Sequence, residues 1–182
     1  MTILALDTSN KTLSVAVELT DGTIIEQTIE NTLQHSVLLM PTIEAVFNEA
    51  SITAKDLTKV VVAQGPGSYT GLRIGITVAK TLAKSLGIPL VGVSSLDVFL
   101  PDLTSKVEVG ELVVPFFDAR RGNIFAVGYQ KTDEGFEKVI PERHSSWDVF
   151  LKSLPEQSDG VTFVGQLQSI TKEAIVEKGA SE

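Results

Sequence analysis

Short apolar stretches open the chain and are separated by polar turns. Residues 2–6, 13–19 and 23–29 each have the length and composition of a strand. The last two flank Asp21-Gly22, a dipeptide typical of hairpin turns. We therefore expect an antiparallel meander over the first thirty residues.

Residues 35–50 have the spacing of a surface helix. Their apolar side chains fall on one stripe of about 100°. The stripe consists of Leu39, Ile43, Val46, Phe47 and Ala50. Ser36 is the expected N-cap of this helix, and Pro41 lies early in it, where a kink is its main cost.

A strand, a glycine-rich break and a second helix follow. Residues 59–63 are almost entirely apolar, as expected for a central strand buried on both faces. After the break, the pattern predicts a helix over 70–86 that ends at Gly87, and a further strand over 88–93.

The second half repeats this order of elements. Strands are expected over 112–117, 124–130, 136–140 and 161–164, with a helix capped by Ser145 or Ser146 that runs to residue 154, and a last helix over 167–178. Asp7 lies six residues before Leu13, as Asp118 does before Ile124. Chance agreement between two α/β segments is the alternative. We interpret the pattern as a duplicated β-β-β-α-β-α unit with lobes at 1–105 and 106–182.

Composition and charge exclude several kinds of chemistry. The 182 residues include no cysteine, which excludes disulfides, thiolate zinc sites, iron–sulfur clusters and a cysteine nucleophile. The two histidines are isolated in sequence, so no metal site is expected. A net charge of −8 predicts poor binding to RNA by the chain as a whole, although a local basic patch remains open. No leader-like or membrane-spanning stretch is evident, and we expect a cytoplasmic protein.

Residues 64–73, Gln-Gly-Pro-Gly-Ser-Tyr-Thr-Gly-Leu-Arg, are the most distinctive segment. Free N–H groups at the start of a helix bind anions, but the segment lacks the Gly-Lys-Ser/Thr ending of a P-loop. The alternative is tight packing of strand on helix, with Ser68 or Thr70 as the cap. Likewise, Asp7 and Asp118 either face a cleft as paired carboxylates or cap turns. The sequence thus offers only weak cofactor-binding candidates: Asp7, Gly65, Gly67, Ser68 and Asp118.

The duplicated unit resembles the actin-like ATPase fold of sugar kinases and Hsp70. Several segments are also similar, in order, to the bacterial TsaB family, also called YeaZ. They are residues 3–9 (Ile-Leu-Ala-Leu-Asp-Thr-Ser), His35-Ser36, residues 65–75 (Gly-Pro-Gly-Ser-Tyr-Thr-Gly-Leu-Arg-Ile-Gly), residues 93–96 (Val-Ser-Ser-Leu) and residues 118–122 (Asp-Ala-Arg-Arg-Gly). Members of this family usually continue beyond the point where this sequence stops, which leads us to expect a shortened second lobe.

The resemblance implies a part in making threonylcarbamoyladenosine, the modified adenosine beside the anticodon of certain tRNAs. In that family the catalytic paralogue TsaD carries the metal, and TsaE is an ATPase partner. The metal-binding histidines of TsaD correspond here to Ser95 and Phe99, which are poor ligands. The resemblance therefore implies a scaffold with no catalytic residues and no cofactor, which forms a homodimer when alone and meets tRNA only through the complex. The alternatives are a kinase-like ATP-binding enzyme and a glycoprotease-type peptidase.

The two helices of the first lobe carry more apolar surface than one sheet needs. The arc on residues 70–86 spans about 200°, whereas packing on a sheet uses about 100°. We therefore predict an interface with a second copy or with TsaD, formed by Leu38, Ala45, Gly71, Ile74, Gly75 and Val78. Contact between the two helices of the same lobe is the alternative.

Overall fold

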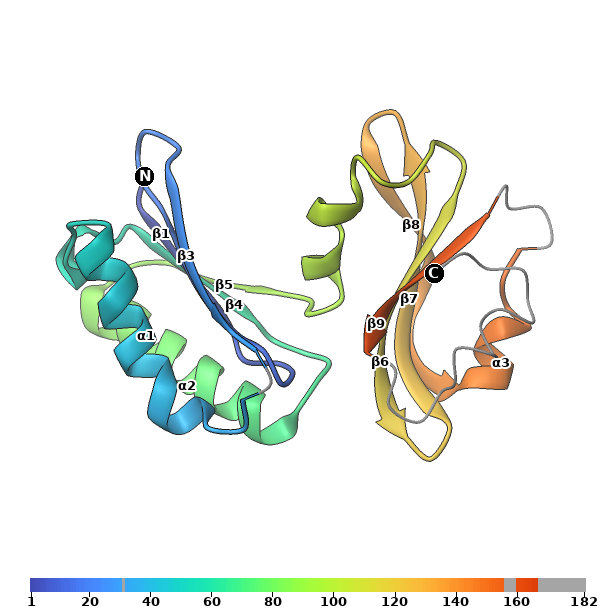
Figure 1. The fold of residues 1–182 in the computed structure, drawn as a ribbon, viewed down its shortest axis with the longest axis horizontal. Helices are drawn as coiled ribbons and strands as arrows, with labels where there is room; N and C mark the ends of the chain where they lie inside the picture. Colours follow the sequence, from blue (N-terminus) through green and yellow to red (C-terminus); the bar gives the residue numbers. More distant parts are fainter. Residues whose placement is uncertain (31, 156–159, 167–182) are drawn as a thin grey trace. The chain divides into compact units, whose positions relative to one another are not determined.

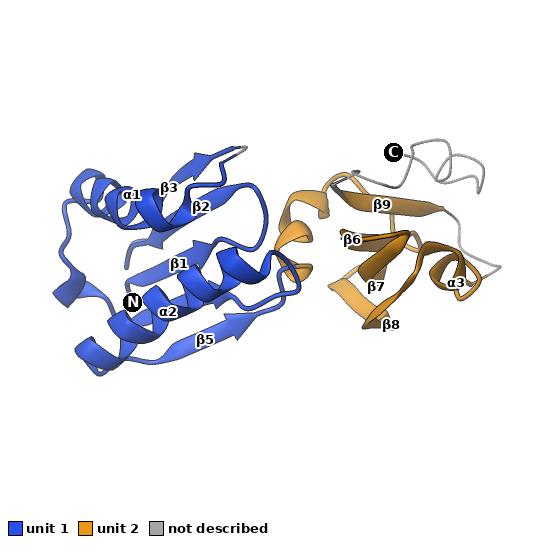
Figure 2. Cartoon of the chain, turned by 90° about the horizontal axis from the view of Figure 1, so that it is seen from below, with its two compact units in different colours: residues 1–95 blue, residues 96–182 orange. Residues whose placement is uncertain are grey.

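The computed structural model describes residues 1–30, 32–155 and 160–166. The chain divides into two compact units, Met1–Ser95 and Leu96–Glu182, which Figure 2 shows in two colours. The domain boundary after residue 105 stays a prediction. Each unit contains one sheet, and the units are described separately below.

The first unit is built on a five-stranded sheet. Its strands are β1 (Ile3–Asp7), β2 (Leu13–Glu18), β3 (Ile24–Ile29), β4 (Lys59–Ala63) and β5 (Leu90–Val93). They follow the order β3-β2-β1-β4-β5 (Figure 1). The first three strands are antiparallel, and β4 runs parallel to both β1 and β5. The predicted meander and the predicted inner strand are both confirmed.

Helices α1 (His35–Glu49) and α2 (Tyr69–Leu86) cover one face of this sheet, as Figure 1 shows. A short turn of 3-10 helix, η1 (Ala54–Asp56), lies between α1 and β4. The alternating residues of β1, β2 and β4 point at the helices and are buried with them: Leu4, Leu6, Leu13, Val15, Val17, Val60 and Val62. The helices also contact each other. This layer forms the core of the first unit.

The ends of the helices test the expected caps. The Ser68 side chain accepts a hydrogen bond from the Gly71 N–H, and Gly87, in the left-handed conformation, ends α2, so both predictions are confirmed. The expected Ser36 cap is wrong, because α1 begins one residue earlier, at His35, after Gln34. There the Thr32 hydroxyl accepts from the Gln34 N–H at 3.0 Å and fixes the entry of the chain.

The second unit repeats the arrangement. It contains the short helices η2 (Asp97–Phe99) and η3 (Pro101–Leu103), strands β6 (Leu112–Arg120), β7 (Asn123–Thr132), β8 (Gly135–Ser146) and β9 (Val161–Gln166), and helix α3 (Trp147–Leu151). The strand order β8-β7-β6-β9 matches β3-β2-β1-β4, and β9 is parallel to β6 as β4 is to β1. The duplicated unit is thereby confirmed. The predicted last helix, 167–178, falls outside the described residues.

Strand β8 is longer than predicted. It pairs with β7 along its whole length, with register shifts between Ala126 and Tyr129, and continues past Pro141 to Ser146. β8 is an edge strand, where proline costs no ladder hydrogen bond. The Ser146 side chain then caps α3, as one of the two expected alternatives.

Both faces of the second sheet are packed. On one face the rings of Phe116, Trp147 and Phe163 contact one another, with centroids 5.1–6.3 Å apart. On the other face Leu96 is buried with Phe117, Val127 and Tyr129. Within the described residues, no helix has the length and apolar character needed to span a membrane.

Candidate functional site

Asp7 and Asp118 make equivalent hydrogen bonds in the two units. The Asp7 carboxylate accepts from the Ser9 N–H at 2.7 Å, and the Asp118 carboxylate accepts from the Arg120 N–H at 2.6 Å. Each bond stabilises the turn after the first strand of its unit. This geometry agrees with the turn-capping alternative. A shared cleft for the two carboxylates stays a prediction.

The glycine-rich loop packs tightly against the end of β1. A side chain at Gly67 would collide with the Ser9 carbonyl, and one at Gly71 would collide with the Thr8 carbonyl. The Ser68 N–H donates to the Ser9 carbonyl at 2.6 Å, so this helix-start donor is already used. The Gly65 N–H likewise donates to the Ser95 hydroxyl at 3.1 Å. The glycines therefore serve the close approach of strand, loop and helix.

One buried hydroxyl near the end of β1 makes no hydrogen bond with the described residues. Ser9 is fully buried beside Gly67, and its Oγ has no hydrogen-bond partner within the part of the chain that the structure describes. The Nε2 of the buried His35 likewise has no hydrogen-bond partner among the described residues. Among the side chains of residues 1–30 and 32–95, these two are the buried polar atoms that have no hydrogen-bond partner. The cofactor-binding role of the loop stays a prediction.

Ser95 and Phe99, which the resemblance leads us to expect at the positions of the TsaD metal ligands, take part in packing. The backbone of buried Ser95 donates to the Gly65 carbonyl at 2.8 Å, which ties the end of β5 to the glycine-rich loop. The Phe99 ring lies 5.6 Å from the Phe117 ring in the second unit. Over residues 1–30, 32–155 and 160–166, no group of three or more His, Asp or Glu side chains could hold a metal ion.

The predicted interface residues fall into two classes. Leu38, Ile74 and Val78 are partly buried against the first core, and Ala45 is also partly exposed. Gly71 and Gly75 are buried, and Thr8 fills the space beside them. The close approach that these two glycines allow is therefore to β1, not to another helix. Their assignment to a partner interface stays a prediction.

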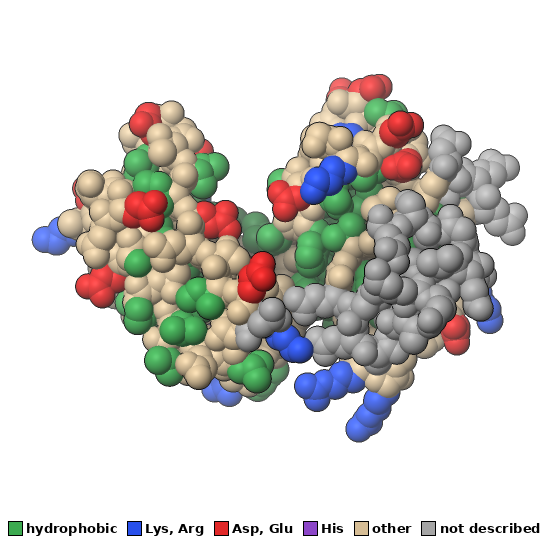
Figure 3. Space-filling view, viewed as in Figure 1, with side chains coloured by type: hydrophobic (Ala, Val, Ile, Leu, Met, Phe, Trp, Pro, Cys, Tyr) green, Lys and Arg blue, Asp and Glu red, His purple; other side chains and the backbone are tan. Residues whose placement is uncertain are grey.

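Three exposed apolar side chains at and just before the start of α1 were missed by the sequence analysis. Leu33, Val37 and Met40 have exposed fractions of 84%, 64% and 51%. Val37 and Met40 are three residues apart in α1 and lie on one side of that helix, whereas Leu33 lies just before the helix begins. Tyr69, at the start of α2, is 73% exposed. We call these four residues the apolar stripe, and Figure 3 shows apolar side chains at the surface over α1 and α2.

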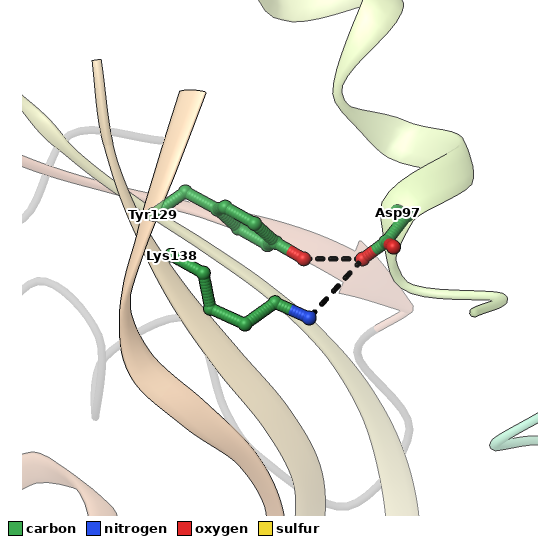
Figure 4. Close-up of polar contacts among 3 residues, drawn as sticks. All are labelled: Asp97, Tyr129 and Lys138. Atoms are coloured by element: carbon green, nitrogen blue, oxygen red, sulfur yellow. Dashed lines mark hydrogen bonds and ion pairs between the residues drawn. The ribbon is translucent and has the colours of Figure 1, made fainter. Parts of the chain in front are cut away.

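A polar cluster joins η2 to the second sheet (Figure 4). The hydroxyl of buried Tyr129 donates to the Asp97 carboxylate, and Lys138 Nζ lies 4.0 Å from the same carboxylate. Lys138 also lies 5.3 Å from the centre of the Tyr129 ring. Burial and the bond to Asp97 raise the pKa of Tyr129. The cluster anchors the segment that follows Ser95, and nothing in the sequence pattern had indicated it.

Comparison with known proteins adds independent evidence. Residues 23–178 match the family model "TsaD: tRNA N6-adenosine threonylcarbamoyltransferase". The tRNA threonylcarbamoyladenosine biosynthesis protein TsaB of Bacillus subtilis is 42% identical over 96% of this chain and 75% of its own length. The protein of the same name from Escherichia coli is 31% identical over 74% of this chain and 58% of its own length.

Solved structures agree with the sequence matches. YeaZ from Pseudomonas aeruginosa has a TM-score of 0.72 and 25% identity, over 88% of this chain and 83% of that one. A protein described as similar to peptidase YeaZ, from the same organism, has a TM-score of 0.75 and 26% identity, over 89% of this chain and 74% of that one. Together with the repeated sheet topology, these matches establish a duplicated actin-like fold.

Proposed function

The chain belongs to the TsaB (YeaZ) family and takes part in tRNA threonylcarbamoyladenosine biosynthesis. From this premise, we propose that the chain is a non-catalytic subunit that activates a TsaD-like paralogue. The partner would carry the metal and transfer the threonylcarbamoyl group. A TsaE-like ATPase would join the same complex. Without these partners, the chain would pair with a second copy of itself.

The described residues at the sheet edges support a non-catalytic role. Ser95 and Phe99, the expected counterparts of the TsaD metal ligands, are used in packing. The Asp7 carboxylate is used in a turn, and the Ser68 N–H is used by the Ser9 carbonyl. These groups hold the fold together, which supports a subunit without catalytic residues of its own.

The observation that carries the proposal is the apolar stripe on α1 and α2. Val37 and Met40 on one side of α1, with Leu33 before that helix and Tyr69 at the start of α2, leave apolar area in water that association would bury. Tyrosine is also among the residue types that most often dominate interface energetics. The partly exposed Leu38, Ala45, Ile74 and Val78 extend this surface.

Binding of such a subunit raises activity by shifting a population. A ligand that binds one conformation of its partner more tightly than another increases the fraction of that conformation. Contact through α1 and α2 would select the conformation in which the catalytic paralogue is active. No group of the present chain needs to reach the reacting atoms.

Two variants test the interface. Val37→Glu plus Met40→Glu places two charges on the apolar stripe, whereas Thr77→Glu plus Thr81→Glu places two charges at exposed polar positions of α2. We expect light scattering to show a monomer for the first variant and the wild-type mass for the second. Binding to the TsaD-like partner should be weakened only by the first. Unchanged mass and unchanged partner binding for a folded Val37→Glu plus Met40→Glu variant would contradict the proposal.

A further inference from the structure

The turn between β6 and β7 has an unusual backbone. Arg120, Arg121 and Gly122 are consecutive residues with φ of 69°, 55° and 73°. This left-handed region is disfavoured for any residue that has a side chain, and asparagine and glycine occupy it most readily. Two adjacent arginines are therefore a costly choice for this turn. An outlier of this kind often marks a functional position.

Surrounding groups hold the turn in this conformation. The Asp118 carboxylate accepts from the Arg120 N–H, and the Asn123 side-chain amide donates to the Arg120 and Arg121 carbonyls at 3.3 and 3.4 Å. The Gly122 carbonyl accepts from the Trp147 N–H at the start of α3, at 2.9 Å. Both arginines are thus presented from a fixed backbone.

Neither guanidinium is neutralised by a neighbour that the structure describes. Arg120 and Arg121 are exposed, and within the described ranges no ion pair involves them. In a chain with a net charge of −8, this is a local basic patch. Figure 3 shows basic side chains at the end of the second unit where the β6–β7 turn lies in Figure 1. Unpaired arginines on a rigid turn suit phosphate groups, which they contact with two hydrogen bonds each.

An aromatic pair lies on the strands beside the turn. Phe125, two residues beyond Asn123, is half-buried and pairs across the sheet with exposed His144. Their ring centres are 4.9 Å apart. Rings at a protein surface next to arginines provide a platform on which an unstacked base rests.

We propose that the β6–β7 turn and this pair form an RNA-contact site, in which Arg120 and Arg121 bind backbone phosphates and Phe125 with His144 stacks a base. The ligand would be a single-stranded or loop segment of the tRNA substrate, because a duplex does not offer an unstacked base. The inference rests on the proposed role in tRNA modification. The proposed site would contact tRNA directly, whereas the sequence resemblance implied that the chain meets tRNA only through the complex.

The left-handed backbone of the turn suggests a variant that removes the charges without destabilising the fold. Arg120→Asn plus Arg121→Asn removes both charges and installs the residue that tolerates the left-handed region. We therefore expect this variant to be at least as stable as the wild type in urea unfolding. Lys55→Asn plus Lys106→Asn is the matched control, since it removes two charges at exposed positions elsewhere. Phe125→Leu removes one ring of the platform and keeps an apolar side chain.

Fluorescence anisotropy with a labelled, unmodified tRNA transcript measures the contact, for the full chain alone and in its complex with the TsaD-like partner. Arg120→Asn plus Arg121→Asn should weaken binding about tenfold at about 50 mM salt. It should also reduce the slope of log affinity against log salt by about 1.4, because two phosphate contacts are lost. Phe125→Leu should weaken binding about fivefold with an unchanged slope. The lysine control should bind like the wild type.

RNA affinity that is the same in the asparagine variant and the wild type would overturn the inference, including the case in which neither binds. If that variant also lost assembly onto the TsaD-like partner, the turn would be assigned to an acidic protein surface. The proposed subunit role has a separate readout, the need for the wild-type chain in the modification reaction, so the two failures are distinguishable.

Discussion

The side-chain hydroxyl of Thr8 occupies the space in which a side chain at Gly75 would begin. The same hydroxyl donates to the Gly71 carbonyl at 2.8 Å, one turn earlier in α2. Thr8 is fully buried and directly follows β1. One side chain thus docks the second helix onto the first strand, and the two glycines allow it to do so.

Gly75→Ala should destabilise the protein by about 1–3 kcal/mol, because the new methyl group collides with the Thr8 hydroxyl. Thr8→Ala alone should cost about 1 kcal/mol through the lost hydrogen bond to the Gly71 carbonyl. The double variant should cost less than the sum, since Thr8→Ala removes the hydroxyl with which the new methyl group collides. Urea unfolding of the wild type, the two single variants and the double variant measures this coupling.

Gly71→Ala provides the contrast. Its added methyl group meets the backbone carbonyl of Thr8, which Thr8→Ala leaves in place. Here Thr8→Ala should relieve little of the cost of Gly71→Ala, because the carbonyl with which the methyl group collides is still present. Rescue of Gly71→Ala by Thr8→Ala would show that the helix is docked in some other way.

Tyr129→Phe should change how stability depends on pH in alkaline solution. The raised pKa of Tyr129 means that the unfolded chain loses the phenolic proton near pH 10 while the folded chain retains it. The stabilisation is complete below pH 10 and is lost as the pH rises above that value. The urea midpoint of the wild type should therefore fall more steeply between about pH 9.5 and 11 than that of Tyr129→Phe. Parallel curves would argue against the Tyr129–Asp97 bond.

Much of the fold could be predicted because local signals and tertiary packing agree. The inner strand Lys59–Ala63 could be predicted from its apolar run alone. The end of α2 could be predicted from Gly87, which adopts the left-handed conformation. Ser36 was a good cap by residue type. The first turn of α1 instead began at His35, a buried residue whose position depends on the rest of the fold.

The site was less predictable because it depends on contacts between distant residues. Gly71 and Gly75 have a spacing that suits a second helix, and only the structure shows that Thr8 takes that space. The Asp97–Tyr129 bond joins residues 32 positions apart, which no period reveals. The turn capping by Asp7 and Asp118, in contrast, was available from residue type and position.

Titration with Mg-ATP tests the nucleotide-binding alternative. We expect calorimetry to give no saturable heat, because the Ser68 N–H already donates to the Ser9 carbonyl and the glycines are packed against β1. Saturable heat in the wild type that disappears in Asp7→Asn would favour the kinase-like alternative.

Substitutions on α2 test whether its apolar flank contributes to association. Ile74→Glu plus Val78→Glu should abolish dimer formation and should also lower stability, since both side chains are partly buried. Thr77→Glu plus Thr81→Glu has the same charges and spacing on the exposed side and should do neither. Dimers of wild-type mass in a folded Ile74→Glu plus Val78→Glu variant would restrict the interface to α1.

Reconstituted threonylcarbamoylation of tRNA tests the central claim most directly. The reaction contains the TsaD-like and TsaE-like proteins, the threonylcarbamoyl-adenylate donor and a tRNA transcript, and modified adenosine is quantified by mass spectrometry. We predict that the wild-type chain and Thr77→Glu plus Thr81→Glu support modification, and that Val37→Glu plus Met40→Glu does not. Equal modification without the chain would contradict the proposal that it activates the catalytic paralogue.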